Sequence, residues 1–299
     1  MNKKLVRGIW PALCTAFDDS GARVDAGRQR ALVRALIDTG IQGFFVCGGT
    51  GEGRAMSMPE RTEVAEIVAD EVAGEVRIIL HAGGTSTENA VELARHAARL
   101  KGIDAVASAA PVDAPNDLVA AVAHYAAIGA ATDLPFFVYW LMREADTGAT
   151  ADSFLEAMRE GPNFAGVRFT DHNLYLFGQL IDRSGGWVNA VSGPDELALP
   201  AMVMGADAAI GSTYNIMPKI FLGMRRAFDA GDLAAARACQ QQANRVIRLL
   251  LEVGVLPGIK QMLADRGTPA GPTRIDPPLD PAAKIALRAG LEQLDIDIR

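Results

Sequence analysis

Lysine is scarce in this chain of 299 residues, because arginine supplies most of its 29 basic side chains. The 36 acidic residues outnumber them and give a formal net charge of −7. Binding to the phosphate backbone of nucleic acid needs a basic surface, so we expect no nucleic-acid partner. A mechanism that needs a lysine amine has few candidates: Lys3, Lys4, Lys101, Lys219, Lys260 and Lys284.

Cysteine is rare as well: the three residues Cys14, Cys47 and Cys239 are far apart and form no CxxC pair. This pattern predicts neither a disulfide framework nor a zinc-thiolate site, and it favours a reducing, cytoplasmic compartment. Long apolar runs are also missing. The run at 135–142 is far too short to cross a bilayer, so no membrane partner is expected.

Two patterns alternate along the chain, which is 49% hydrophobic and can bury a large core. Short apolar runs predict strands, and amphipathic stretches between them predict helices. Eight such units favour a (β/α)8 TIM barrel within the α/β class. A doubly wound sheet is the alternative, but no GxGxxG follows the first strand. The predicted strands are 9–17, 43–49, 77–83, 105–111, 136–140, 166–170, 187–193 and 208–213.

The last part of the sequence reads as helices alone, at 232–253, 257–265 and 281–294. No linker rich in Ser and Gly separates them from the rest. We therefore expect a barrel at 1–230 and a C-terminal helical extension at 231–299 that packs on it as one structural unit.

Barrel enzymes carry their chemistry where the strands end, which directs attention to the turn Gly48-Gly49-Thr50-Gly51-Glu52. Glycine lets a ligand approach the backbone closely and leaves N–H groups free to bind an anion such as a carboxylate. Gly49, Thr50 and Gly51 are therefore candidate binding residues. A tight turn without a ligand explains the same pattern.

Two polar residues stand inside apolar strands. Tyr139, within 136–140, is suited to proton transfer, or it is a core aromatic with a satisfied hydroxyl. Arg168, within 166–170, carries a permanent charge that is costly to bury alone. It either holds a buried carboxylate of the protein or receives an anionic substrate, since guanidinium matches the geometry of a carboxylate.

Asp195 and Glu196 follow the seventh predicted strand. They are candidate acceptors for substrate hydroxyls, but acidic residues also stabilise the first turn of a helix. Among the histidines, His81 and His172 are expected near the barrel mouth as possible acid/base groups, and His96 and His124 on partly exposed helical positions. The histidines show no metal-ligand spacing, so no metal is predicted.

These segments together resemble the family of pyruvate-dependent aldolases that includes dihydrodipicolinate synthase and N-acetylneuraminate lyase. The turn at 48–52 resembles the family's G-[ST]-T-G-E, and 166–170 its G-[IVL]-K-x-[ST] strand, which ends here at Thr170. The runs 193–196 and 204–215 are most similar to the lyase branch. The resemblance extends from about residue 8 to about residue 229.

The resemblance implies that the Thr50 turn holds the carboxylate of a 2-keto acid and that Tyr139 moves a proton. In the family itself, a lysine of the sixth strand forms a Schiff base with the keto carbon of the substrate. Further expected substrate-binding residues are Thr170, Gly193, Asp195, Glu196 and Ser212. The resemblance also implies a homo-oligomer, either a tetramer or a dimer.

The chain departs from this family at the keto-acid end. Arg168 stands at the position of the Schiff-base lysine, and a guanidinium cannot replace a nucleophilic amine. Gly49 replaces the first hydroxyl of the family turn. The family's tyrosine after strand four has no match in 111–116, and 140–142 replaces its N-x-P.

We therefore predict a lyase-like enzyme that acts on a 2-keto acid or sugar acid without a Schiff base. In this prediction Arg168 and Tyr139 are the catalytic residues. The alternative is a catalytically silent protein that binds sugar acids. No sequence motif indicates a nicotinamide, flavin or pyridoxal cofactor.

Overall fold

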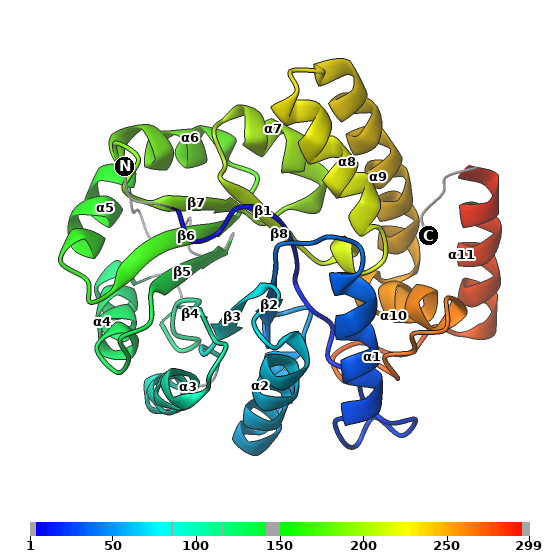
Figure 1. The fold of residues 1–299 in the computed structure, drawn as a ribbon, viewed down its shortest axis with the longest axis horizontal. Helices are drawn as coiled ribbons and strands as arrows, with labels where there is room; N and C mark the ends of the chain where they lie inside the picture. The colour runs from blue at the N-terminus through cyan, green and yellow to red at the C-terminus, as the bar shows by residue number, and fades with distance from the viewer. Residues whose placement is uncertain (1–3, 85, 115–116, 142–149, 295–299) are drawn as a thin grey trace.

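The computed structural model describes residues 4–84, 86–114, 117–141 and 150–294. Eight parallel strands form one sheet in the order β1-β8-β7-β6-β5-β4-β3-β2. An isolated parallel bridge between Ala12 and Phe45 brings β1 back to β2, so the sheet curls into a nearly closed barrel (Figure 1). The strands are β1 (Gly8–Pro11), β2 (Gly43–Val46), β3 (Arg77–His81), β4 (Ala105–Ser108), β5 (Phe136–Leu141), β6 (Phe164–Thr170), β7 (Asn189–Ser192) and β8 (Ala208–Gly211).

Helices follow the strands and surround the barrel, as Figure 1 shows. Several begin at a side-chain cap, such as the capping box of Ser57 and Glu60 before α2. The helices around the barrel are α1 (Ala26–Ile37), α2 (Met58–Val72), α3 (Thr87–Arg99), α4 (Leu118–Gly129), α5 (Ala151–Arg159), α6 (Leu174–Arg183), α7 (Ala198–Val203) and α8 (Pro218–Asp229). Short 3-10 turns lie at η1 (Gly53–Ala55), η3 (Asp195–Leu197) and η4 (Thr213–Asn215).

Three further helices follow the barrel: α9 (Leu233–Val253), α10 (Val255–Asp265) and α11 (Pro281–Leu294). One face of α9, which includes Ala236, Ala243 and Leu250, is buried. In Figure 1, α9 runs along α8, and α10 and α11 lie beside it. None of the helices in the described parts of the chain is both long enough and apolar enough to cross a membrane.

The side chains of the strands separate into two clusters. One fills the space between sheet and helices, and it takes Val138 and Trp140 from β5 and Val167 and Phe169 from β6. The other draws one or two residues from most of the strands, among them Tyr139. Because successive side chains of a strand point to opposite faces, the second cluster is the barrel interior, and Arg168 points into it.

The predicted TIM barrel with C-terminal helices is confirmed, although some strands are shorter than predicted. The first was expected at 9–17, but β1 ends at Pro11. Beyond it, the side chain of Asn215 accepts a hydrogen bond from the N–H of Cys14 and donates to the carbonyl of Ala12. A side chain from the end of β8 therefore replaces the ladder partner that a longer strand would use.

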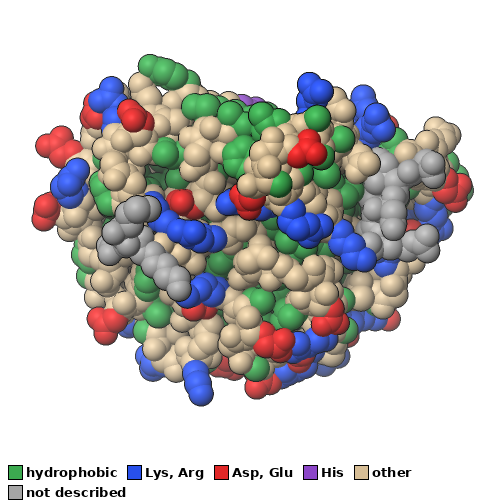
Figure 2. Space-filling view, turned by 45° about the horizontal axis from the view of Figure 1, so that its top comes forward, with side chains coloured by type: hydrophobic (Ala, Val, Ile, Leu, Met, Phe, Trp, Pro, Cys, Tyr) green, Lys and Arg blue, Asp and Glu red, His purple; other side chains and the backbone are tan. Residues whose placement is uncertain are grey.

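Acidic and basic side chains are interspersed on the face shown in Figure 2, where Lys and Arg form no continuous basic surface. This agrees with the net charge of −7.

Candidate functional site

Tyr139 and Arg168 form the centre of the candidate site, at directly paired positions of β5 and β6. The guanidinium carbon of Arg168 lies 4.3 Å from the centre of the Tyr139 ring and 4.4 Å from that of Phe45. Gly48 leaves the space that this arrangement needs, because a Cβ there would lie 2.6 Å from the Phe45 ring. Two aromatic faces thus support one cation inside the barrel.

The charge of Arg168 is almost fully buried, with 4% of the residue exposed. Its Nη2 donates to the carbonyl of Ile210 at 3.2 Å. Its Nε and Nη1 have no hydrogen-bond partner, and no carboxylate in the described segments forms an ion pair with it. A buried guanidinium with unused donors has the chemistry to receive an anion.

The turn after β2 approaches the end of β8. The hydroxyls of Thr50 and Ser212 lie 2.6 Å apart, and Thr15 donates to the carbonyl of Gly51 at 2.6 Å. Non-glycine residues with a left-handed backbone flank the turn, with φ of 59° at Cys47 and 54° at Glu52. The turn therefore has a strained, specific shape rather than a relaxed one.

Asp195 is buried in η3 near the guanidinium. Its Oδ2 accepts from the backbone N–H and the hydroxyl of Thr213, both at 2.7 Å. Burial raises the pKa of Asp195 from its usual 3.8 to about 6, while the bonds from Thr213 and the charge of Arg168 lower it. Asp195 lies in the first turn of η3, and its carboxylate also accepts a hydrogen bond from the first N–H of η4, so the explanation by helix termini remains beside the proposed role in binding.

Glu196 lies at the rim of the same region. Its Oε1 is 3.1 Å from Nε2 of His172, and both side chains are largely exposed. The helix α9 closes this side, because Asn244 donates to the carbonyl of Glu196 at 3.4 Å and Gln240 donates to that of Asp195 at 3.1 Å.

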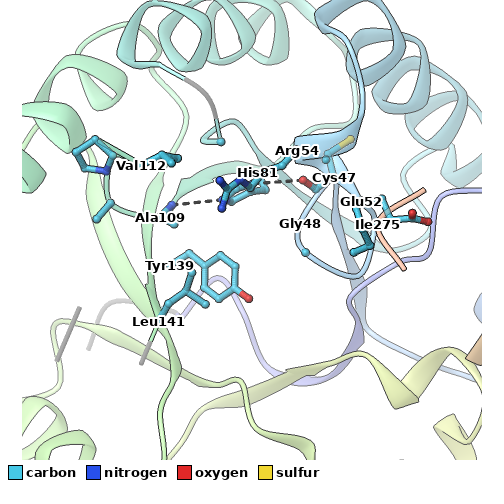
Figure 3. Close-up of a pocket in the computed structure, with 15 residues that line it drawn as sticks. Cys47, Gly48, Glu52, Arg54, His81, Ala109, Val112, Tyr139, Leu141 and Ile275 are labelled. Atoms are coloured by element: carbon cyan, nitrogen blue, oxygen red, sulfur yellow. Dashed lines mark hydrogen bonds between the residues drawn. The ribbon is translucent and has the colours of Figure 1, made fainter. Parts of the chain in front are cut away.

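Two cavities lie at this end of the barrel, and Arg168 itself lines neither, although Tyr139, which stacks on its guanidinium, lines one. The other, of about 410 Å³, we call the polar cavity for its acidic and hydroxyl groups, although apolar side chains such as Ile247 and Leu251 also line it. It contains five of the predicted substrate-binding residues: Thr170, Gly193, Asp195, Glu196 and Ser212. The cavity beside Tyr139, of about 390 Å³, is lined by Gly49, His81 and Tyr139 together with apolar residues such as Val112 and Leu141 (Figure 3).

Thr50 is the neighbour of Gly49, which lines the cavity beside Tyr139, and Ser212 lines the other cavity. The contact between the Thr50 and Ser212 hydroxyls therefore lies between the two cavities. Gly51 lines neither cavity, because it is packed against the carbonyl of Leu13.

His81 does not fit the acid/base role considered for it. Its Nδ1 lies 3.3 Å from the carbonyl of Cys47, and its Nε2 accepts from the N–H of Ala109 at 3.3 Å. Burial, with the charges of Arg61 and Arg168, lowers the pKa of His81 from 6.5 to about 3. Both ring nitrogens are thus occupied and the ring is neutral, which makes it a structural link among β2, β3 and β4 (Figure 3).

The expectation that His124 is partly exposed is wrong. The residue is 4% exposed, and its ring nitrogens contact Thr87 at 2.8 Å and Ser108 at 2.9 Å. Burial lowers its pKa from 6.5 to about 4. The helix α4 is apolar around most of its circumference, so its pattern did not reveal which face is buried.

Neither cavity has a lysine among its described lining residues. Lys260 of α10 is buried against Glu52, with its Nζ 2.6 Å from Oε1. Over the described residues, no group of three or more His, Cys, Asp or Glu side chains is arranged to hold a metal ion.

A (β/α)8 barrel whose buried cation and polar side chains gather where the strands end has the arrangement of a barrel enzyme. Residues 5–293 match the sequence model of the dihydrodipicolinate synthetase family, and the chain belongs to this family. N-acetylneuraminate lyase of Citrobacter koseri is 38% identical over 261 residues, which cover 87% of this chain and 86% of the relative.

Solved structures agree with this assignment. The N-acetylneuraminate lyase (sialic acid aldolase) of Aliivibrio salmonicida has a TM-score of 0.91 at 29% identity, with 98% of each chain covered. A catalytic lysine mutant of Ruminococcus gnavus sialic acid aldolase has a TM-score of 0.90 at 28% identity, covering 96% of this chain and 95% of that one. The description of that relative thus names a catalytic lysine, and the chain is N-acetylneuraminate lyase-like.

Proposed function

We propose that this protein is a lyase that binds a 2-keto acid or sugar acid against Arg168 and breaks a bond of the substrate without a lysine Schiff base. The observation that carries the proposal is the buried guanidinium of Arg168, with Nε and Nη1 unpartnered and no ion-pair partner in the described chain. An anionic substrate would compensate this charge.

The side chain at this position supports a mechanism without an imine. The resemblance of β6 to the family strand implies that Arg168 stands where the family has its lysine, and one relative is described by its catalytic lysine. A guanidinium is protonated and delocalised, so it cannot attack a carbonyl. Lys260 is engaged by Glu52 and by the carbonyl of Pro272 at 2.9 Å, and it lines neither cavity of the site.

Arg168 would act instead as a fixed positive charge. In a retro-aldol cleavage the substrate hydroxyl loses its proton, the carbon–carbon bond breaks, and its electrons form an enolate. A cation that is already oriented stabilises this charge without rearrangement. Tyr139, stacked against Arg168, is the group proposed to transfer the proton, which finally moves to the enolate carbon.

The polar cavity would hold the remainder of the substrate. Asp195, Glu196, Ser212 and Thr170 offer acceptors and hydroxyls that suit the alcohol groups of a sugar acid, and Gly193 lets the backbone come close. The turn at 49–51 would hold the carboxylate through its N–H groups. The substrate therefore extends from the turn across Arg168 into this cavity.

A second candidate, a catalytically silent protein that binds sugar acids, is supported by one contact. The Thr50 hydroxyl is paired with Ser212, and among the described residues no hydroxyl bonds to the Tyr139 phenol. A continuous path for the proton from Tyr139 is therefore not formed in the protein alone.

The test compares the wild type with Arg168→Lys on a panel of 2-keto-3-deoxy sugar acids and N-acetylneuraminate. Pyruvate release, product mass and calorimetric binding are measured, and borohydride reduction followed by mass spectrometry detects an imine. We expect turnover by the wild type without a trapped adduct. An adduct on the wild type overturns the imine-free mechanism. Binding without any product supports the silent binder, and neither binding nor product rejects the substrate class.

A further inference from the structure

Glu52 ends the signature turn and is among the residues that line the cavity beside Tyr139, but its carboxylate points away from Tyr139. In Figure 3 its carboxylate lies on the far side of the 48–53 turn from Tyr139. The side chain of Glu52 is fully buried, and that of its partner Lys260 is 3% exposed. A buried carboxylate of this kind requires fixed partners, and all of those observed come from the C-terminal extension.

Three groups hold the two carboxylate oxygens. Lys260 Nζ lies 2.6 Å from Oε1, while the Thr273 hydroxyl and the Arg274 backbone N–H donate to Oε2 at 3.0 and 2.5 Å. We call Lys260, Thr273 and Arg274 the C-terminal clamp. Lys260 also donates to the carbonyl of Pro272 at 2.9 Å, which ties α10 to the segment that carries Thr273.

The clamp is anchored to the barrel on its other side. The guanidinium of Arg274 stacks on Phe17 at 3.9 Å, donates to the carbonyl of Gly21 at 2.6 Å, and pairs with Glu60 of α2 at 2.7 Å. The segment around Thr273 is thus fixed to the loop after β1 and to α2. It provides a rigid support for Glu52 rather than a flexible tail.

The turn needs such a support because its backbone is strained. Cys47 and Glu52 both have a left-handed backbone, which is unfavourable for a non-glycine residue. The turn is also closed by backbone bonds from Glu52 N–H to the Gly49 carbonyl and from Gly53 N–H to the Gly48 carbonyl, both at 3.0 Å. A change of φ at Glu52 would relieve this backbone strain, and it would turn the backbone N–H groups of the 48–51 turn away from the site.

We propose that Lys260 and Thr273 are positioning residues: through Glu52 they fix the turn at 48–51 in the shape that receives the substrate carboxylate. The C-terminal extension then helps to shape the substrate-binding turn, although none of the clamp residues touches the substrate. If the clamp is weakened by substitution, we expect the protein to bind its ligand less tightly and the turn to become less ordered. The first expectation rests on the proposed function. The second does not, because it concerns the protein without a ligand.

The sharpest variants are Thr273→Val, which removes the hydroxyl while keeping the shape, and Thr273→Ser, which keeps the hydroxyl. Lys260→Met is the stronger variant, and Arg288→Met is the matched control. Arg288 pairs with Asp265 of α10 at 2.6 Å in the same extension, where it is half exposed and does not contact Glu52. If Lys260→Met does not fold, the Thr273 pair still decides.

Two measurements are made on the full chain. Amide hydrogen exchange over residues 47–55 reports the order of the turn, and calorimetry with pyruvate reports affinity. A bond to a charged group is worth about 1.5–3 kcal/mol, so we expect Thr273→Val to raise exchange and weaken pyruvate about tenfold or more. Thr273→Ser should restore both, and Arg288→Met should change neither.

Unchanged exchange at 47–55 in both Thr273→Val and Lys260→Met would overturn the proposal. So would an equal loss of affinity in Arg288→Met, because it would show a general effect of destabilisation. If the wild type binds no pyruvate, the proposed substrate class is in doubt, and the exchange result then decides the positioning role alone.

Discussion

The guanidinium of Arg168 lies over the ring of Tyr139, at 4.3 Å, from the paired position of the neighbouring strand. The side chain that carries the buried charge and the side chain proposed to move a proton therefore form one unit. A substrate group that approaches the unused Nε and Nη1 also approaches this unit.

Arg168→Met is expected to stabilise the protein while abolishing binding of 2-keto acids. The variant removes an uncompensated buried charge, and the lost stacking on Phe45 and Tyr139 offsets part of the gain. We expect the free energy of unfolding to rise by about 1 kcal/mol or more. Urea denaturation and calorimetry with pyruvate measure the two effects. A destabilised Arg168→Met would show that Arg168 serves the fold instead.

Gly49→Ser is expected to fold normally and to raise the activity of Arg168→Lys. A Cβ at Gly49 would meet no atom within 4 Å, and φ at this position is not in the left-handed region. Its effect on stability should stay within about 0.5 kcal/mol. In the Arg168→Lys background the added hydroxyl restores a group that the family turn carries. Pyruvate release by the double variant, compared with Arg168→Lys alone, is the measurement.

The result for Gly49→Ser separates two explanations. Higher pyruvate release in the double variant than in Arg168→Lys supports loss of the hydroxyl as part of a change of mechanism. Equal release would show that this hydroxyl has no role in the pocket. A clear fall in melting temperature in the single variant would contradict the open space beside Gly49.

The sequence predicted the strands that carry the two candidate catalytic residues, because the strand pattern is strong there. Tyr139 and Arg168 stand between apolar neighbours that pack on the helices, so the alternation of a strand turns both inward. Asp195 and Ser212 follow predicted strands, as Thr50 does, so the sequence also predicted that the three lie at one end of the barrel. Parallel strands of a barrel all end on one side, which makes this part of a site accessible to sequence reasoning.

The support of the site could not be predicted in this way. Thr273 and Glu52 are 221 positions apart, and no periodicity links a turn after β2 with a loop rich in proline and glycine. Lys260 appeared as a helical residue of the tail because a charged residue in an amphipathic helix usually faces solvent. Its burial is a tertiary effect that only the folded chain displays.

Asp195→Asn is expected to stabilise the protein more at pH 7 than at pH 4. The folded pKa of Asp195, about 6, is raised above the usual 3.8, so the ionised form is disfavoured in the fold. Between these values the folded state binds more protons, and the contribution of Asp195 to stability falls as pH rises. The asparagine removes this penalty, so its advantage over the wild type grows from pH 4 to pH 6 and is constant above. Urea denaturation at a series of pH values measures it.

The control for this prediction is Asp232→Asn, a change at an exposed helix cap whose side chain accepts from the Ala235 N–H. Its effect should not follow the pH course of Asp195→Asn between pH 4 and 6. If the two variants share one profile, the raised pKa of Asp195 is not the cause. An advantage for Asp195→Asn that shrinks as pH rises would contradict the assignment directly.

His124 is expected to make the protein sensitive to acid below pH 6.5. Its pKa is lowered from 6.5 to about 4, so the folded state keeps the ring neutral while the unfolded state takes up a proton. The stability that this provides is complete above pH 6.5 and is lost as pH falls toward 4. At about 1.4 kcal/mol for each pKa unit, the loss is about 3 kcal/mol. His124→Gln should be less stable than the wild type at pH 7, and the difference should shrink in acid.

The ring of His172 is 60% exposed, so His172→Gln is the matched control and should keep the acid sensitivity of the wild type. A constant difference between His124→Gln and the wild type from pH 7 to pH 4 would exclude His124 as the source, since a lost hydrogen bond alone does not depend on pH.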